Sequence, residues 1–78
     1  MNLKYKMLKY SVMWLHHSLV QNGKYVEARV VLQLLRRKQV TLILTDTNFE
    51  VARLLDELGC RTFYPRHIIA LVYLEVKT

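Results

Sequence analysis

Hydrophobic positions in residues 3–21 recur at the spacing of an α-helix. At about 100° per residue they form two apolar stripes that lie side by side on the helix surface. The first stripe is Leu3, Met7, Tyr10 and Trp14, and the second is Leu8, Val12, Leu15 and Leu19. An apolar arc this wide exceeds what one neighbour needs. We therefore expect the helix to pack against two elements, or against one element and a second copy of the chain, and we expect Tyr10 to belong to the core.

Asn22 and Gly23 predict the end of this helix, because glycine readily adopts the left-handed backbone common at helix termini. Residues 24–38 then predict a second helix with one apolar and one basic face. A strand that begins at Tyr25 competes with it, since several valines follow, but the i, i+3, i+4, i+7 pattern favours the helix. The apolar face is Tyr25, Ala28, Val31, Leu32 and Leu35, and the basic face is Arg29, Gln33, Arg36 and Arg37.

The turn between these two helices carries a resemblance to a known family. The segment Gly23-Lys24-Tyr25-Val26-Glu27-Ala28, with Leu15 before it and Leu32 after it, resembles the turn and small-residue spacing of a tetratricopeptide-type helical hairpin. The sequence departs from that pattern at His16, where a small residue is usual, and it has no proline near residue 40. One hairpin cannot form the stacked array of such repeats. The resemblance therefore implies an αα-hairpin over residues 12–35 and no function.

The second half of the chain predicts a strand followed by a helix. Val40–Thr45 is short, β-branched and bounded by polar residues, which is typical of a buried strand. Thr47 with Glu50 three residues later is a capping-box signature. We therefore expect a helix over 48–58, and Gly59 to end it.

Two further strands are expected after this helix. Cys60–Tyr64 predicts one that Pro65 breaks, and Ile68–Val76 predicts another, although periodicity alone also allows a helix there. A strand–helix–strand unit implies a parallel pair with a right-handed crossover. The last strand would return as a hairpin around Pro65-Arg66-His67. We expect the helix at 48–58 on one face of the sheet and the N-terminal hairpin on the other.

Together these elements predict an α/β fold in which an N-terminal helical hairpin packs on a small β-α-β-β sheet. The 78 residues suit a single domain, 1–78, with a basic helical hairpin at 1–39 and the β-α-β-β half at 40–78. The hydrophobic share of 53% excludes a disordered chain. Two glycines and one proline exclude a collagen-like chain, and one cysteine excludes a disulfide scaffold.

The chain lacks the usual signs of export or membrane insertion. No compact apolar segment with a cleavage site follows its basic start, so no signal peptide is expected. The longest uncharged run, Tyr10–Gly23, has 14 residues, whereas a spanning helix needs about 20. A lone cysteine suits a reducing compartment. We therefore expect a cytoplasmic protein with no membrane partner.

Positive charge is concentrated in the first half of the chain. Residues 1–45 carry eight lysines and arginines against one acid, a net +7, whereas residues 46–78 carry four against five acids, a net −1. This asymmetry predicts a face that binds a polyanion, with a merely solvated basic surface as the alternative. Tyr5 and Tyr10 lie among the lysines and can stack on bases. The candidate binding residues are Lys4, Lys6, Lys9, Arg29, Gln33, Arg36, Arg37 and Lys38.

Residues that could carry chemistry form no recognisable catalytic pattern. Asp46 and Glu50 lie where a strand meets a helix, which suits a metal-dependent nuclease, but acids there also complement a helix N-terminus. The adjacent His16 and His17 point about 100° apart, and no histidine or cysteine spacing matches a zinc site. We expect no catalytic residue, no metal and no cofactor, and a buried structural role for Cys60.

The sequence thus predicts a small basic protein that is not an enzyme and acts by occupancy. Its predicted partner is RNA or another nucleic acid, or a ribonucleoprotein, bound through the basic helical face. One alternative is a protein–protein regulator or inhibitor of the kind encoded as an accessory protein by phages and other mobile elements. A second alternative is a minimal metal-dependent nuclease centred on Asp46. The wide apolar arc of the first helix predicts a homodimer.

Overall fold

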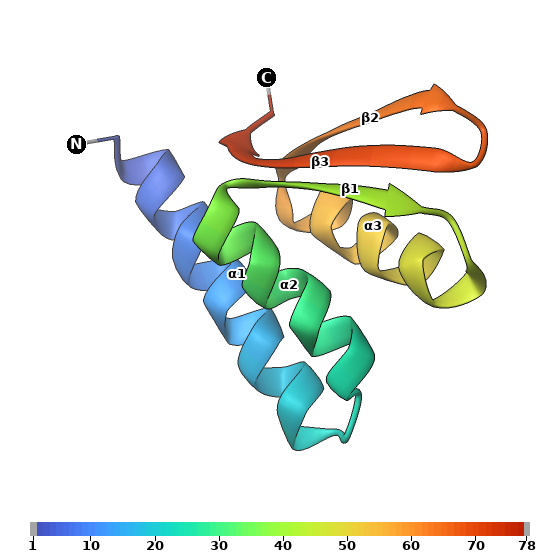
Figure 1. The fold of residues 1–78 in the computed structure, drawn as a ribbon. Coiled ribbons are helices and arrows are strands. Elements are labelled where there is room, and N and C mark those ends of the chain that lie inside the picture. The colour runs from blue at the N-terminus through green and yellow to red at the C-terminus, as the bar shows by residue number, and fades with distance from the viewer. Residues whose placement is uncertain (1, 78) are drawn as a thin grey trace.

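Three helices and three strands make up the computed structural model, which describes residues 2–77. The order is α1 (Leu3–Gln21), α2 (Tyr25–Arg37), β1 (Gln39–Ile43), α3 (Asp46–Leu58), β2 (Cys60–Arg66) and β3 (Ile69–Val76). A helical hairpin is therefore followed by a β-α-β-β unit, as predicted (Figure 1). The strand considered as an alternative at Tyr25 is wrong, and so is the helix considered at 68–76.

The helical hairpin is closed by polar caps and one glycine. The Asn2 side chain accepts a hydrogen bond from the backbone N–H of Lys4 at 2.8 Å and begins α1. Gly23 has φ +73°, a left-handed conformation that glycine adopts without steric cost. The backbone N–H of Lys24 then donates to the carbonyl of Leu19 at 2.8 Å. The chain therefore reverses tightly, and α1 and α2 lie antiparallel (Figure 1).

The sheet is antiparallel throughout, so the predicted adjacent parallel pair is wrong. The strand order is β1-β3-β2, and β3 pairs antiparallel with both neighbours. The reason is that β2 and β3 are separated only by His67 and Ile68, so their hairpin closes a very short loop at little entropic cost. β1 then pairs with the free edge of β3, where Val40 lies opposite Val72.

Pro65 does not break β2, which continues to Arg66. β2 is an edge strand, and its pairing with β3 shifts register between Phe63 and Arg66. An edge position at such an irregularity tolerates a residue without an N–H donor. The hairpin turn therefore lies at His67 and Ile68, slightly later than predicted.

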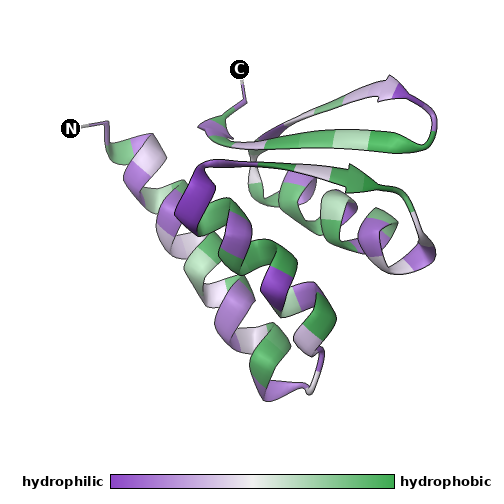
Figure 2. Cartoon of the chain, in the orientation of Figure 1, coloured by the Kyte–Doolittle hydropathy of each residue, from purple (hydrophilic) through white to green (hydrophobic). Residues whose placement is uncertain are grey.

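All three helices lie on the same face of the sheet, so the predicted placement on opposite faces is wrong (Figure 1). The strands bury alternate residues on that face: Val40, Leu42, Ala70, Val72 and Leu74. β3, the central strand, is hydrophobic along most of its length (Figure 2). Because the strands bury side chains on one face only, one layer of helices is enough to cover them. Antiparallel sheets commonly leave their second face to solvent.

Only one stripe of α1 enters the core. Leu8, Val12, Leu15 and Leu19 are buried against α2, α3 and β3, which all lie on that side of the helix. The other stripe, Leu3, Met7, Tyr10 and Trp14, faces outward. The prediction that Tyr10 belongs to the core is wrong, since its side chain is 57% exposed.

The core face of α2 is also rotated from the predicted one. Ala28 and Val31 are buried as predicted, but Leu34, which was left out of the predicted apolar face, is fully buried. Tyr25 is 67% exposed because it opens the helix beyond the edge of the core.

α3 begins two residues earlier than predicted. The hydroxyl of Thr45 caps the helix by accepting a hydrogen bond from the N–H of Asn48 at 3.2 Å. The Asn48 amide in turn donates to the carbonyl of Ile43 at 2.8 Å and fixes the strand–helix corner. The predicted capping box of Thr47 and Glu50 is therefore wrong. Gly59 ends the helix as predicted, with φ +112°.

Gly59→Ala should lower the free energy of unfolding by ~1–2 kcal/mol, because an L-residue is strained at this φ. The added Cβ would meet only Leu8 Cδ1 at 3.8 Å, an ordinary contact, so the loss of stability reports backbone strain.

Lys38→Gly should raise the free energy of unfolding, because Lys38 is the one non-glycine residue with positive φ (+69°) among residues 2–77. Urea denaturation measures both, and equal stability of Gly59→Ala and the parent would contradict the assignment.

Candidate nucleic-acid interface

The outward ridge of α2 is basic along its length. Ala28, Val31 and Leu34 hold the opposite side of the helix in the core. The polar residues of the ridge follow Arg29 at positions i+4, i+7 and i+8, and this helical spacing places them on the solvent side. These residues, Arg29, Gln33, Arg36 and Arg37, are all exposed.

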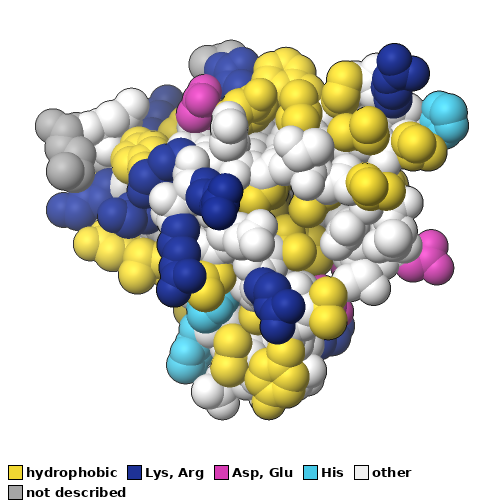
Figure 3. All heavy atoms as spheres, in the orientation of Figure 1, with side chains coloured by type: hydrophobic (Ala, Val, Ile, Leu, Met, Phe, Trp, Pro, Cys, Tyr) yellow, Lys and Arg dark blue, Asp and Glu magenta, His cyan; other side chains and the backbone are white. Residues whose placement is uncertain are grey.

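The antiparallel hairpin brings lysines of α1 toward this ridge. The N-terminal half of α1 lies beside the C-terminal half of α2, and Lys6 and Lys9 are both exposed there. Figure 3 shows lysine and arginine side chains gathered over α2 and the N-terminal part of α1. We call the set Lys6, Lys9, Arg29, Gln33, Arg36, Arg37 and Lys38 the basic face.

Lys4 does not join this set. It lies about 140° around α1 from Lys9, and it lines a hollow of about 250 Å³ with Met7, Leu58 and Val76 at the end of α3. Lys4 therefore faces a different side of α1 from Lys9, whereas Lys6 lies nearly opposite the buried Leu8 and Leu15 and points to solvent.

Lys38 is a structural part of the basic face. Its backbone N–H donates to the carbonyl of Leu34 at 2.8 Å, and its carbonyl accepts from the N–H of Leu74 at 2.9 Å. Its Nζ donates to the carbonyl of Leu35 at 3.3 Å. A positive charge at a helix C-terminus is favourable, so Lys38 ends α2 and connects it to the sheet.

A polar hollow lies between the basic face and the edge of the sheet. It has a volume of about 470 Å³ and is lined by Gln33 and Arg37 of α2 and by Gln39, Val40 and Thr41 of β1. β1 is an edge strand, so within the described part of the chain one side of its backbone has no strand partner. Guanidinium, amide and hydroxyl groups together match the oxygen atoms of a phosphate or sugar.

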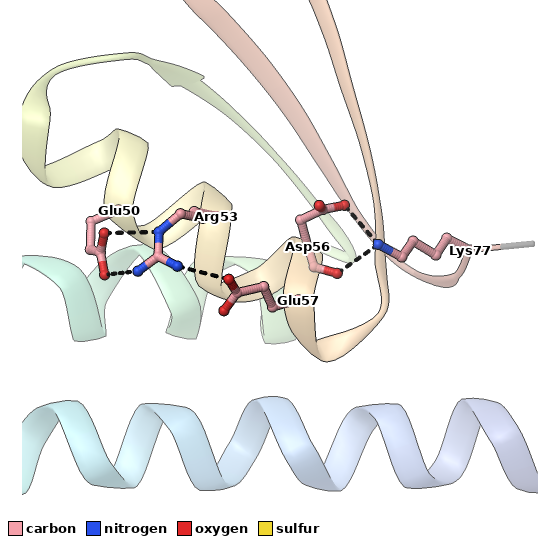
Figure 4. Close-up of polar contacts among 5 residues, drawn as sticks. All are labelled: Glu50, Arg53, Asp56, Glu57 and Lys77. Carbon is pink, nitrogen blue, oxygen red and sulfur yellow. Dashed lines mark hydrogen bonds and ion pairs between the residues drawn. The ribbon is translucent and has the colours of Figure 1, made fainter.

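Four of the six acidic residues form ion pairs, and all of these pairs lie away from the basic face. Arg53 bonds to Glu50 at 2.6 Å and to Glu57 at 2.7 Å, and Lys77 bonds to Asp56 at 3.1 Å (Figure 4). Arg61 and Glu75 lie 3.5 Å apart. Within residues 2–77 no ion pair involves a residue of the basic face, so its charge is left to attract an outside anion.

Asp46 and Glu50 do not form a metal site. Glu50 accepts two hydrogen bonds from Arg53, at 2.6 and 3.2 Å, and this guanidinium lowers the pKa of the Glu50 carboxyl. Asp46 lies in the first turn of α3, where a carboxylate is favourable. In the described part of the chain, no three side chains of His, Cys, Asp or Glu gather in a way that could hold a metal.

The three histidines do not gather at one place, and Cys60 is fully buried. His16 and His17 lie on α1, whereas His67 lies in the turn between β2 and β3. Burial, followed by the negative charge of Asp56, raises the pKa of the Cys60 thiol to about 11, although Lys77 acts in the opposite direction. The thiol is therefore protonated at neutral pH, and the burial predicted for Cys60 is confirmed.

An aromatic pair on the outer face of the sheet was missed by sequence reasoning. The rings of Phe63 and Tyr73 meet edge to face, with centroids 5.9 Å apart and planes at 81°. The missing information was the pairing of β2 with β3, which brings them together. The two tyrosines proposed to stack lie on α1, where Tyr5 is half-buried and Tyr10 is exposed.

Comparison with known proteins gives no family assignment. The chain matches no protein-family model, and neither the search of curated proteins nor that of solved structures finds a match. No helix of residues 2–77 is both long and apolar enough to cross a membrane.

Cys60 should be inert toward Ellman's reagent in the native protein at pH 8 and should react at once in denaturant. Its raised pKa keeps the thiolate fraction far below that of a free cysteine. Because the folded pKa exceeds the unfolded one, this group also destabilises the fold as the pH rises from about 9 toward 11. A native reaction rate equal to that of a free thiol would contradict the burial.

Proposed function

We propose that the protein binds nucleic acid, RNA in preference to DNA, through its basic face. It is not an enzyme and acts by occupying its target. The observation that carries this proposal is a set of exposed cations on α1 and α2 with no ion pair in the described residues. Phosphates are the natural partners of such a face, because each contact releases a condensed counterion.

The sequence carries no recognised DNA-binding motif beside the basic face. Arginines can contact guanine in the major groove, but such contacts need a motif that fixes the helix in the groove. Contact with the phosphate backbone or with a single strand is therefore favoured over reading of bases in a duplex. RNA or a ribonucleoprotein in the cytoplasm is therefore the proposed target, with the cytoplasm inferred from the single reduced cysteine.

Fluorescence anisotropy with labelled RNA and DNA of equal length tests the proposal. Five contacts to a single strand predict a salt slope of about −3.5, so affinity should fall roughly 100-fold between 50 and 200 mM salt. Arg36→Ala should weaken binding roughly five- to tenfold and reduce the slope by about 0.7.

Lys24→Ala is the matched control. It removes the same charge, but Lys24 precedes the first residue of α2 and lies roughly 18 Å from Arg36 along the helix. Its effect on affinity should be under twofold. No binding at 50 mM salt, or equal losses from both variants, would refute the proposal.

The alternative function, a protein–protein regulator or inhibitor, is favoured by a different observation. The stripe Leu3, Met7, Tyr10 and Trp14 is exposed along one side of α1, with side chains 57–69% accessible. Large exposed apolar patches are typical of protein interfaces. This stripe also supports the proposed homodimer.

Light scattering tests the dimer, which should have twice the 9.3 kDa mass of the chain at micromolar concentration. α1 carries lysines and no acid, so paired copies repel and salt should strengthen the dimer, the reverse of its effect on nucleic-acid binding. Trp14→Glu should give monomers, whereas Val26→Glu, at an equally exposed apolar position on α2, should not. A 9.3 kDa particle for the parent protein at high salt would rule the dimer out.

A further inference from the structure

The outer face of the sheet is a second uncovered surface beside the basic face. All three helices lie on the inner face, so the outward side chains of the strands meet solvent (Figure 1). In cross-strand rows these are Gln39, Tyr73 and Arg61, then Thr41, Leu71 and Phe63, then Ile43 and Ile69. Figure 3 shows hydrophobic side chains along the top of the molecule, over the strands.

The aromatic pair at the centre of this face is rigidly held. Phe63 is 47% exposed, Tyr73 is half-buried, and the two rings meet edge to face. Both residues lie on paired strands, so little conformational freedom remains to be lost when a flat ligand binds. Exposed aromatic rings on a fixed platform are what bases stack on in proteins that bind single strands.

The aromatic pair is continuous with the basic face through β1. Gln39 and Thr41 line the polar hollow together with Arg37. Gln39 lies opposite Tyr73, and Thr41 lies opposite Leu71, which is itself opposite Phe63. Neighbouring strands are about 4.8 Å apart, so Tyr73 is one strand and Phe63 two strands from the hollow. A single strand with a phosphate in the hollow can therefore reach the pair with its neighbouring bases by crossing β1.

The basic face and the outer face of the sheet differ in charge, so they contribute differently to binding. Next to Tyr73, Arg61 lies 3.5 Å from Glu75, so this part of the sheet adds little net charge. Salt-dependent affinity then comes from the basic face, and a preference for unpaired bases comes from the rings. Bases in a duplex are stacked on one another and cannot stack on side chains.

We infer that the ligand is single-stranded nucleic acid, which crosses edge strand β1 from the basic face and stacks its bases on Tyr73 and Phe63. This inference rests on the proposed function and names the ligand class of the same site.

The test compares a labelled 12-nucleotide oligouridine with a 12-base-pair RNA duplex in anisotropy titrations. The parent protein should bind the single strand at least tenfold more tightly. The Phe63→Leu/Tyr73→Leu variant, which keeps apolar side chains but loses the rings, should lose at least fivefold for the single strand. Its duplex affinity and its salt slope should stay unchanged. Ile43→Ala, an exposed apolar position on the same face, should change either affinity less than twofold.

Photocrosslinking of the parent protein to 5-iodouridine RNA gives a readout that does not depend on variant stability. Crosslinks should map to peptides that contain Phe63 or Tyr73. If Arg36→Ala weakens binding but crosslinks stay on α1 and α2 and the ring variant binds normally, the inference fails and the proposed function stands. If the parent protein binds neither RNA, the proposed function itself fails.

Discussion

Burial of one face of a three-stranded antiparallel sheet is the constraint on which the rest of the molecule depends. Alternate residues of β1 and β3, such as Leu42 and Val72, meet the helices and become buried. Because all three helices pack on this one layer, each has a side that no other element of residues 2–77 covers. The exposed stripe of α1, the basic ridge of α2 and the outer face of the sheet all follow from that arrangement.

The segregation of charge gives these uncovered surfaces different properties. The second half of the chain pairs four of its five acids with Arg53, Arg61 and Lys77. The first half has a single acid, Glu27, and cannot do the same. The positive potential therefore centres on α2 and the adjoining part of α1, next to the polar hollow at β1. This hollow joins the basic face to the edge of the sheet.

Local signals in the sequence predicted the elements well. Helical periodicity located α1 and α2 almost to the residue, and Gly59 marked the end of α3. The start of α3 was missed because Thr45 and Thr47 are both good caps, and only the hydrogen bond to Asn48 distinguishes them. Periodicity also could not tell which stripe of α1 faces inward, because both are apolar.

Features that depend on pairing could not be read from the sequence. The strand–helix–strand rule assumes that the two strands are neighbours, whereas the short hairpin inserts β3 between them. The aromatic pair depends on the pairing of β2 with β3, and the polar hollow depends on how α2 packs beside β1, so neither was predicted. The exposed cations could be predicted, because Arg29 and Arg36 follow directly from helical spacing.

The most direct test is a two-dimensional ¹⁵N–¹H NMR titration of the labelled protein with a short oligouridine at low salt. Binding across the edge of the sheet predicts concerted shifts in the backbone amides of Gln33, Arg37, Gln39, Phe63 and Tyr73. Signals from α3, such as that of Arg53, should stay in place. Shifts confined to the exposed stripe of α1, or no shifts at millimolar oligonucleotide, would contradict a nucleic-acid site on this surface.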